Sequence, residues 1–75
     1  MTEKEFSSCV DLLLEKMVDR RYSQDTVEGI LIMIMTTKPE FREEAVLHVL
    51  DLLEEYNDEK KFWHAMSRYY VTVWM

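Results

Sequence analysis

The chain has 75 residues, 48% of them hydrophobic, and a formal net charge of −6 at pH 7. This length allows one small domain, and the hydrophobic content is too high for a disordered acidic segment. One Gly and one Pro provide too few turn-forming residues for an all-β fold, and the single Cys9 excludes an internal disulfide. We therefore expect one all-helical domain over residues 1–75, folded as a three- or four-helix bundle.

The first helix is expected over residues 3–20. Thr2 followed three residues later by Glu5 is a capping box, in which each side chain accepts a hydrogen bond from a backbone N–H at the helix start. Arg20 and Arg21 stand where positive charge suits the negative end of the helix dipole. The apolar residues between these ends recur with helical spacing at Phe6, Cys9, Val10, Leu13, Leu14 and Met17.

A second helix is expected over residues 25–36, where Asp25 and Glu28 repeat the capping pattern. Gly29 weakens a helix, and residues 30–37 have enough β-propensity to form a buried strand instead. A single strand would have no partner in an otherwise helical chain, which favours the helix. Its core-facing residues are expected to be Val27, Ile30, Leu31 and Ile34.

Lys38 and Pro39 mark the start of a third helix, expected over residues 39–56, because Pro is favoured in a first helical turn. Asn57 and Asp58 interrupt the apolar pattern and cap a fourth helix, expected over residues 59–73. Residues 69–74 also have strong strand propensity, so the sequence leaves their conformation open. The apolar stripe of the third helix is expected to consist of Phe41, Ala45, Val49, Leu52, Leu53 and Tyr56.

The acidic charge is concentrated in one segment. Residues 40–59 carry eight acids and one base, a local charge of −7, whereas the other 55 residues carry seven acids and eight bases. At about 100° per residue, the carboxylates of the third helix fall within about a third of its circumference, opposite the apolar stripe and with His48 at their edge. We call this face the acidic ridge and define it as Glu40, Glu43, Glu44, Leu47, Asp51, Glu54 and Glu55.

The acidic ridge has three interpretations. It can be a solvated outer face that keeps a small protein soluble. Like charges three or four residues apart destabilise a helix by about 0.2–0.5 kcal/mol per pair, and a face that only confers solubility more often mixes Lys with Glu. The ridge can instead bind a basic protein surface and accelerate the encounter, or mimic nucleic-acid phosphates and inhibit a nucleic-acid-binding protein. Direct binding of nucleic acid is disfavoured, since phosphate contacts need Lys and Arg.

Aromatic residues gather near the end of the chain, where five of the nine lie in the last 14 residues. On a helix, one row faces the core and a second row lies beside it. The second row either completes the core or forms an exposed interface, since Trp and Tyr provide large contact areas. Ile32 and Met33 are expected to point away from the core and to join the second row in a homodimer. The core-facing row is Phe62, Met66, Tyr69 and Val73, and the second row is Trp63, Tyr70 and Trp74.

No strong motif for catalysis, metal binding or nucleotide binding is present in the sequence. Cys9 with His48 or His64 is a possible nucleophile–base combination, but the apolar stripe around Cys9 predicts an inert thiol. Glu44, His48 and Asp51 share one side of a helix, whereas a metal site needs ligands from a second segment. We therefore expect a non-enzymatic protein–protein interaction module, without metal or cofactor, that forms a homodimer and binds a protein with a basic surface.

The compartment expected for the chain is the cytoplasm. Met1 is followed by polar and charged residues rather than by the basic and then apolar stretch of a signal peptide. The longest uninterrupted apolar run, residues 30–35, is too short to span a membrane. A lone cysteine is also typical of a reducing compartment.

Overall fold

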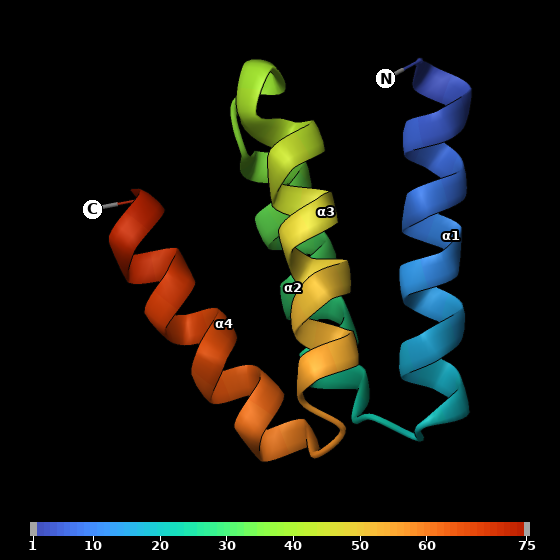
Figure 1. Ribbon diagram of the computed structural model, residues 1–75, viewed down its shortest axis with the longest axis vertical. Coiled ribbons are helices and arrows are strands. Elements are labelled where there is room, and N and C mark those ends of the chain that lie inside the picture. The colour runs from blue at the N-terminus through green and yellow to red at the C-terminus, as the bar shows by residue number, and fades with distance from the viewer. Residues whose placement is uncertain (1, 75) are drawn as a thin grey trace.

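The structure, a computed structural model, describes residues 2–74, with side chains as far as Tyr69. Within this range the chain forms four helices and no strand, which confirms the predicted all-α bundle (Figure 1). Of the two segments that the sequence leaves open, residues 69–74 are helical, and residues 30–37 are helical as far as Thr36, with Thr37 in an extended conformation after the helix end. The helices are α1 (Glu3–Asp19), α2 (Gln24–Thr36), α3 (Pro39–Glu55) and α4 (Glu59–Trp74).

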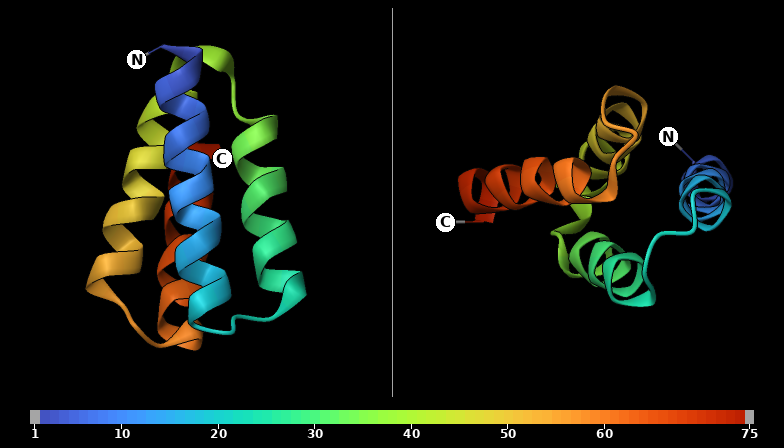
Figure 2. Two further views of the ribbon diagram at one scale, coloured as in Figure 1. Left: turned by 90° about the vertical axis from the view of Figure 1, so that its right-hand side faces the viewer. Right: turned by 90° about the horizontal axis from the view of Figure 1, so that it is seen from below.

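The helices run alternately in opposite directions, and α3 packs against each of the other three. Figure 2 shows α1 and α4 on opposite sides of the α2–α3 pair. Toward its C-terminal end, α4 leans away from α2 and α3 (Figure 1). The most acidic helix of the chain is therefore also the central one, and only its outer face is left for solvent.

The core is formed by buried side chains from all four helices. Each large apolar side chain that is fully removed from water stabilises the fold by about 1.5–3 kcal/mol. Cys9 and several other residues of the predicted α1 stripe pack against this core without being fully buried. The core cluster is Leu13, Met17, Tyr22, Ile30, Met33, Ile34, Val46, Val49, Leu52, Leu53, Phe62 and Met66.

Three predictions of side-chain position are wrong. Phe41, assigned to the buried stripe of α3, is 50% exposed, whereas Val46, omitted from it, is fully buried. The buried arc of α3 is centred near Val49, and at about 100° per residue Phe41 lies farther from that centre than Val46 does. Met33 was expected to face away from the core but is only 6% exposed. This residue lies on the side of α2 that faces α4, and it lines the same groove as Met66.

Side chains cap the starts of α1, α2 and α4, whereas α3 begins with Pro39 and has no side-chain cap. The predicted capping box of α1 is present, with the backbone N–H of Glu5 donating to Oγ1 of Thr2 over 3.1 Å. The predicted cap of α2 is wrong, because Ser23 rather than Asp25 accepts the capping bond and the helix begins one residue earlier. Asp58 caps α4 as expected, since its Oδ1 accepts from the backbone N–H three residues later.

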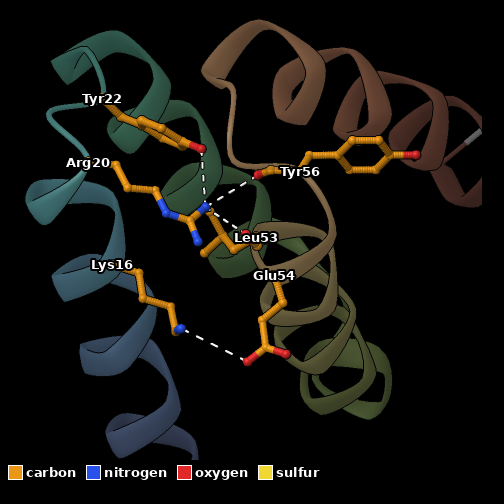
Figure 3. Close-up of polar contacts among 6 residues, drawn as sticks. All are labelled: Lys16, Arg20, Tyr22, Leu53, Glu54 and Tyr56. Carbon is orange, nitrogen blue, oxygen red and sulfur yellow. Dashed lines mark hydrogen bonds and ion pairs between the residues drawn. The ribbon is translucent and has the colours of Figure 1, made fainter.

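Arg20, which the sequence places at the negative end of the α1 dipole, makes its side-chain hydrogen bonds outside α1. The guanidinium of Arg20 reaches the last turn of α3, where it donates to the carbonyls of Leu53 at 2.6 Å and Tyr56 at 3.3 Å (Figure 3). It also donates to the hydroxyl of Tyr22 at 3.3 Å. Because the last carbonyls of a helix lack partners within it, Arg20 fastens α1 to the end of α3.

Arg21 takes a left-handed backbone conformation with φ of 58°. Its N–H donates to the carbonyl of Val18, and the N–H of Tyr22 donates to the carbonyl of Met17, both over 3.0 Å. This pair of bonds is a Schellman motif, whose left-handed position is usually occupied by Gly. The turn from α1 to α2 is therefore sharp and carries local strain at Arg21.

Candidate protein-binding surfaces

The acidic ridge occupies the outer face of α3. All of its seven side chains are exposed, including Leu47, which is 44% exposed among the carboxylates. Most of them, together with His48, surround one shallow hollow. From Glu40 to Glu55 the ridge extends about 22 Å along the helix. The structure thus places every predicted ridge residue on one continuous surface.

The one Lys or Arg on α3, Arg42, does not lie across this ridge. Its Nη2 donates to the carbonyls of Met35 at 3.4 Å and Thr37 at 3.1 Å, which closes the C-terminal end of α2. At the other end of the ridge, Nζ of Lys16 lies 4.0 Å from a carboxylate oxygen of Glu54 (Figure 3). An exposed pair of this kind contributes about 0–1 kcal/mol to stability, and the ridge carries five carboxylates besides Glu54.

The edge of the ridge that faces α4 is an aromatic contact. The rings of His48 and Tyr69 lie with their centroids 4.0 Å apart and their planes at 31°. Burial, and then the nearby charge of Glu44, raise the pKa of the Tyr69 hydroxyl above its ordinary value. Tyr69 therefore stays uncharged at neutral pH and forms an apolar border beside the carboxylates.

Glu59 belongs to the acidic segment of the sequence but not to the ridge. One of its oxygens accepts hydrogen bonds from the N–H and Oγ of Ser23, at 3.0 and 2.8 Å, and from Oγ1 of Thr26 at 2.7 Å. The Thr26 hydroxyl most of all, and then Ser23, hold the pKa of Glu59 below its ordinary value. This carboxylate sits at the N-terminal end of α2, where negative charge is favourable. It joins α4 to α2, a role that only the tertiary structure reveals.

A second surface is an apolar groove of about 410 Å³ between α2 and α4. We call it the α2–α4 groove. Three of the five apolar residues predicted for an interface line it: Ile32 is 63% exposed, Trp63 is 42% exposed, and Met33 is buried. The other two, Tyr70 and Trp74, have side chains outside the described part of the structure. The complete lining is Gly29, Ile30, Ile32, Met33, Thr36, Trp63, Met66 and Ser67.

The only glycine of the chain lies under the indole ring of Trp63. A Cβ at Gly29 would lie 3.0 Å from Cη2 of Trp63, closer than an ordinary contact. A glycine inside a helix costs about 1 kcal/mol relative to Ala, and the close approach of the ring is the physical reason for it here. The sequence indicated close packing at this position, because Gly inside a helical pattern usually has a packing reason. It did not show that Trp63 is the residue that packs there.

The two surfaces lie on opposite flanks of α4. One flank carries Tyr69 against His48 of α3, and the other carries Trp63 against Gly29 of α2. The right-hand view of Figure 2 shows α3 and α2 on either side of the line of α4. Occupation of one surface therefore leaves the other accessible.

Cys9, the residue considered above as a nucleophile, is partly buried against the core. Over the described part of the chain, no three His, Cys, Asp or Glu side chains are grouped to hold a metal ion. In the same range no helix has the length and apolar character needed to cross a membrane.

Comparison of the chain with known protein families, with curated proteins and with solved structures finds no match.

Proposed function

We propose that this chain is a non-enzymatic protein–protein interaction module that binds a protein with a basic surface through the acidic ridge. The observation that supports this most is the position of six exposed carboxylates along about 22 Å of one helix. That helix is held by three neighbours, so its charges are presented in a fixed arrangement. The module also forms a homodimer, for which the α2–α4 groove offers the apolar contact.

The spacing of the ridge favours electrostatic attraction of a partner. Apart from the adjacent pairs Glu43–Glu44 and Glu54–Glu55, neighbouring carboxylates lie one or two helical turns apart, about 5–11 Å along the helix, which is comparable to the Debye length of about 8 Å at physiological salt. Their potentials add, and such a field raises association rates by about 10- to 1000-fold. Leu47 lies inside the charged face and provides apolar contact once the partner has docked. The complementary surface is therefore a basic patch with an apolar depression.

The test is affinity capture from the native host with two variants matched in charge. One reverses three ridge carboxylates and the other reverses three exposed acids on α1, so each has a formal net charge of 0 instead of −6. We expect the ridge variant to lose the partner and the α1 variant to retain it. Equal capture by both variants would contradict the proposal. The ridge substitutions are Glu44→Lys, Asp51→Lys and Glu55→Lys, and the α1 substitutions are Asp11→Lys, Glu15→Lys and Asp19→Lys.

Mimicry of nucleic acid is a second candidate function, favoured by the presence of all six ridge carboxylates on one face of a rigid helix. The ridge nevertheless has no carboxylate between Glu44 and Asp51, a gap of about 10 Å along the helix. A nucleic-acid strand has a phosphate for about every 3.4 Å of axis. Competition distinguishes the two functions: duplex DNA or RNA displaces the chain from its partner if it is a mimic, and leaves the complex intact if the partner surface is not a nucleic-acid site.

A further inference from the structure

The outer rims of the α2–α4 groove carry Asp25 on α2 and Lys60 on α4, beside Glu59, whose carboxylate is already bound by Ser23 and Thr26. Asp25 precedes Ile32 by two helical turns and therefore lies on the same side of α2. On α4, Lys60 and His64 line a hollow that continues the groove past Trp63. Among the described side chains, neither Asp25 nor Lys60 has an ion-pair partner. The opposite charges thus flank one apolar surface without neutralising each other.

A surface with this pattern is complementary to itself in one orientation only. Two identical faces can meet about a two-fold axis that lies between them, either along the groove or across it. An axis across the groove places α4 against the other α4 with the positions along the groove reversed, so that Lys60 comes opposite the far end of that helix and not opposite Asp25. An axis along the groove places α2 of each copy against α4 of the other, so that the rim with Asp25 meets the rim with Lys60. The charges therefore favour the second arrangement.

The N-terminal ends of α2 and α4, which carry Asp25 and Lys60, lie at the same level along the groove. Thr26, next to Asp25 in the sequence, and Lys60 line the same hollow. Oγ1 of Thr26 donates to Glu59, the residue before Lys60, over 2.7 Å. Rotation about an axis along the groove does not change the position of a residue along that axis, so Asp25 of one copy comes opposite Lys60 of the other. Ile32 and Trp63, both well exposed in the single chain, are then covered by the same contact.

We propose that the α2–α4 groove is occupied by the same groove of a second copy of this chain, about a two-fold axis parallel to the groove. Ile32 and Trp63 form the apolar centre of this contact, and Asp25 pairs with Lys60 across it. The proposal rests on the proposed function as an interaction module and specifies how two copies meet. The contact leaves the acidic ridge of each copy free for a partner, because the ridge belongs to α3, which packs against the opposite side of α4 from the groove.

Sedimentation equilibrium of the purified full chain tests the contact. The wild-type chain is expected at twice its mass of 9.1 kDa. Ile32→Glu should weaken the dimer at least about tenfold, since it places a charge in the apolar centre. Val18→Glu is the matched control, because Val18 on α1 is 65% exposed and Ile32 is 63% exposed. Since both side chains point to solvent, both variants are expected to fold, which circular dichroism verifies.

A charge exchange tests the orientation. Asp25→Lys and Lys60→Asp should each weaken the dimer, by about three- to tenfold for a rim pair, and the double variant should restore it. A wild-type chain that stays monomeric up to about 1 mM, where even weak association is detectable, overturns the proposal. So does a dimer that Ile32→Glu leaves intact, or single charge variants without effect. A monomeric chain that still captures a basic protein through the ridge refutes the dimer alone and leaves the proposed function standing.

Discussion

Arg20 offers the sharpest test of how the bundle is held together. It leaves the end of α1 and donates three hydrogen bonds, two of them to carbonyls at the C-terminal end of α3. The bond to Leu53 is short, at 2.6 Å, as expected for a charged donor. All three bonds are donated by Nη1, so Arg20→Met keeps most of the apolar stem, removes that donor and isolates the contribution of the guanidinium.

The expected loss follows from these contacts. A hydrogen bond to a charged group contributes about 1.5–3 kcal/mol, and the half-buried position of Arg20 places it toward the lower end of that range. The two bonds of 3.3 Å are weaker and add little. We therefore expect Arg20→Met to lower the free energy of unfolding by about 2 kcal/mol. For a domain of this size, that corresponds to a fall in Tm of about 8–16 °C.

The neighbouring Arg21 provides a control with the opposite sign. Its side chain is exposed and its φ is 58°, so Arg21→Gly relieves about 1–2 kcal/mol of left-handed strain. The added freedom of Gly in the unfolded chain offsets about 0.5–1 kcal/mol of this gain. Thermal unfolding followed by circular dichroism should show a lower Tm for Arg20→Met and a higher Tm for Arg21→Gly. An Arg20→Met variant within about 0.5 kcal/mol of the wild type would refute the reasoning.

Three further predictions concern the other contacts of the bundle. Glu59→Gln should lower stability at neutral pH. Because the folded state depresses the Glu59 pKa, the ionised carboxylate stabilises the fold above about pH 4.5. The difference in urea midpoint between Glu59→Gln and the wild type should therefore shrink as the pH falls below that value. Gly29→Ala should push the Trp63 ring toward the groove and shift its fluorescence emission, measured with Trp74→Phe as background, while the free energy of unfolding changes by less than about 1 kcal/mol. On α3, Leu53→Ala should cost about 2–5 kcal/mol and the half-exposed Phe41→Ala much less; equal losses in urea titration would contradict the assigned core.

Much of the fold could be predicted from local signals in the sequence. The capping box at Thr2 and Glu5, the Pro at the start of α3 and the apolar period of each helix depend only on residues a few positions apart, and they located the four helices. The cap of α2 was missed because Asp25 and Glu28 fit the capping-box pattern, whereas Ser23 is followed three residues later by Thr26 and does not. Intrinsic preferences do not decide between such candidates, since the contact of Ser23 with Glu59 forms only in the tertiary structure.

Side-chain positions were predicted less completely. The arc of α3 opposite its buried centre was identified correctly, so the acidic ridge is continuous as expected. Phe41 and Val46 lie near the borders of the buried arc, where exposure depends on which neighbour covers that side rather than on periodicity. The same holds for Met33, since it lies on the side of α2 that faces α4. The position of Lys60 on the rim of the α2–α4 groove was not foreseen, because the orientation of α4 relative to α2 is not encoded in any local pattern.

The central claim is that the acidic ridge of α3 binds a basic protein surface. Its most direct test is calorimetric titration of the captured partner with the wild-type chain, the triple ridge variant and the triple α1 variant at matched net charge. The claim predicts a loss of at least about 100-fold in affinity for the ridge variant, close to wild-type affinity for the α1 variant, and weaker wild-type binding at high salt. Equal losses for the two variants would show that only net charge matters and would contradict the claim.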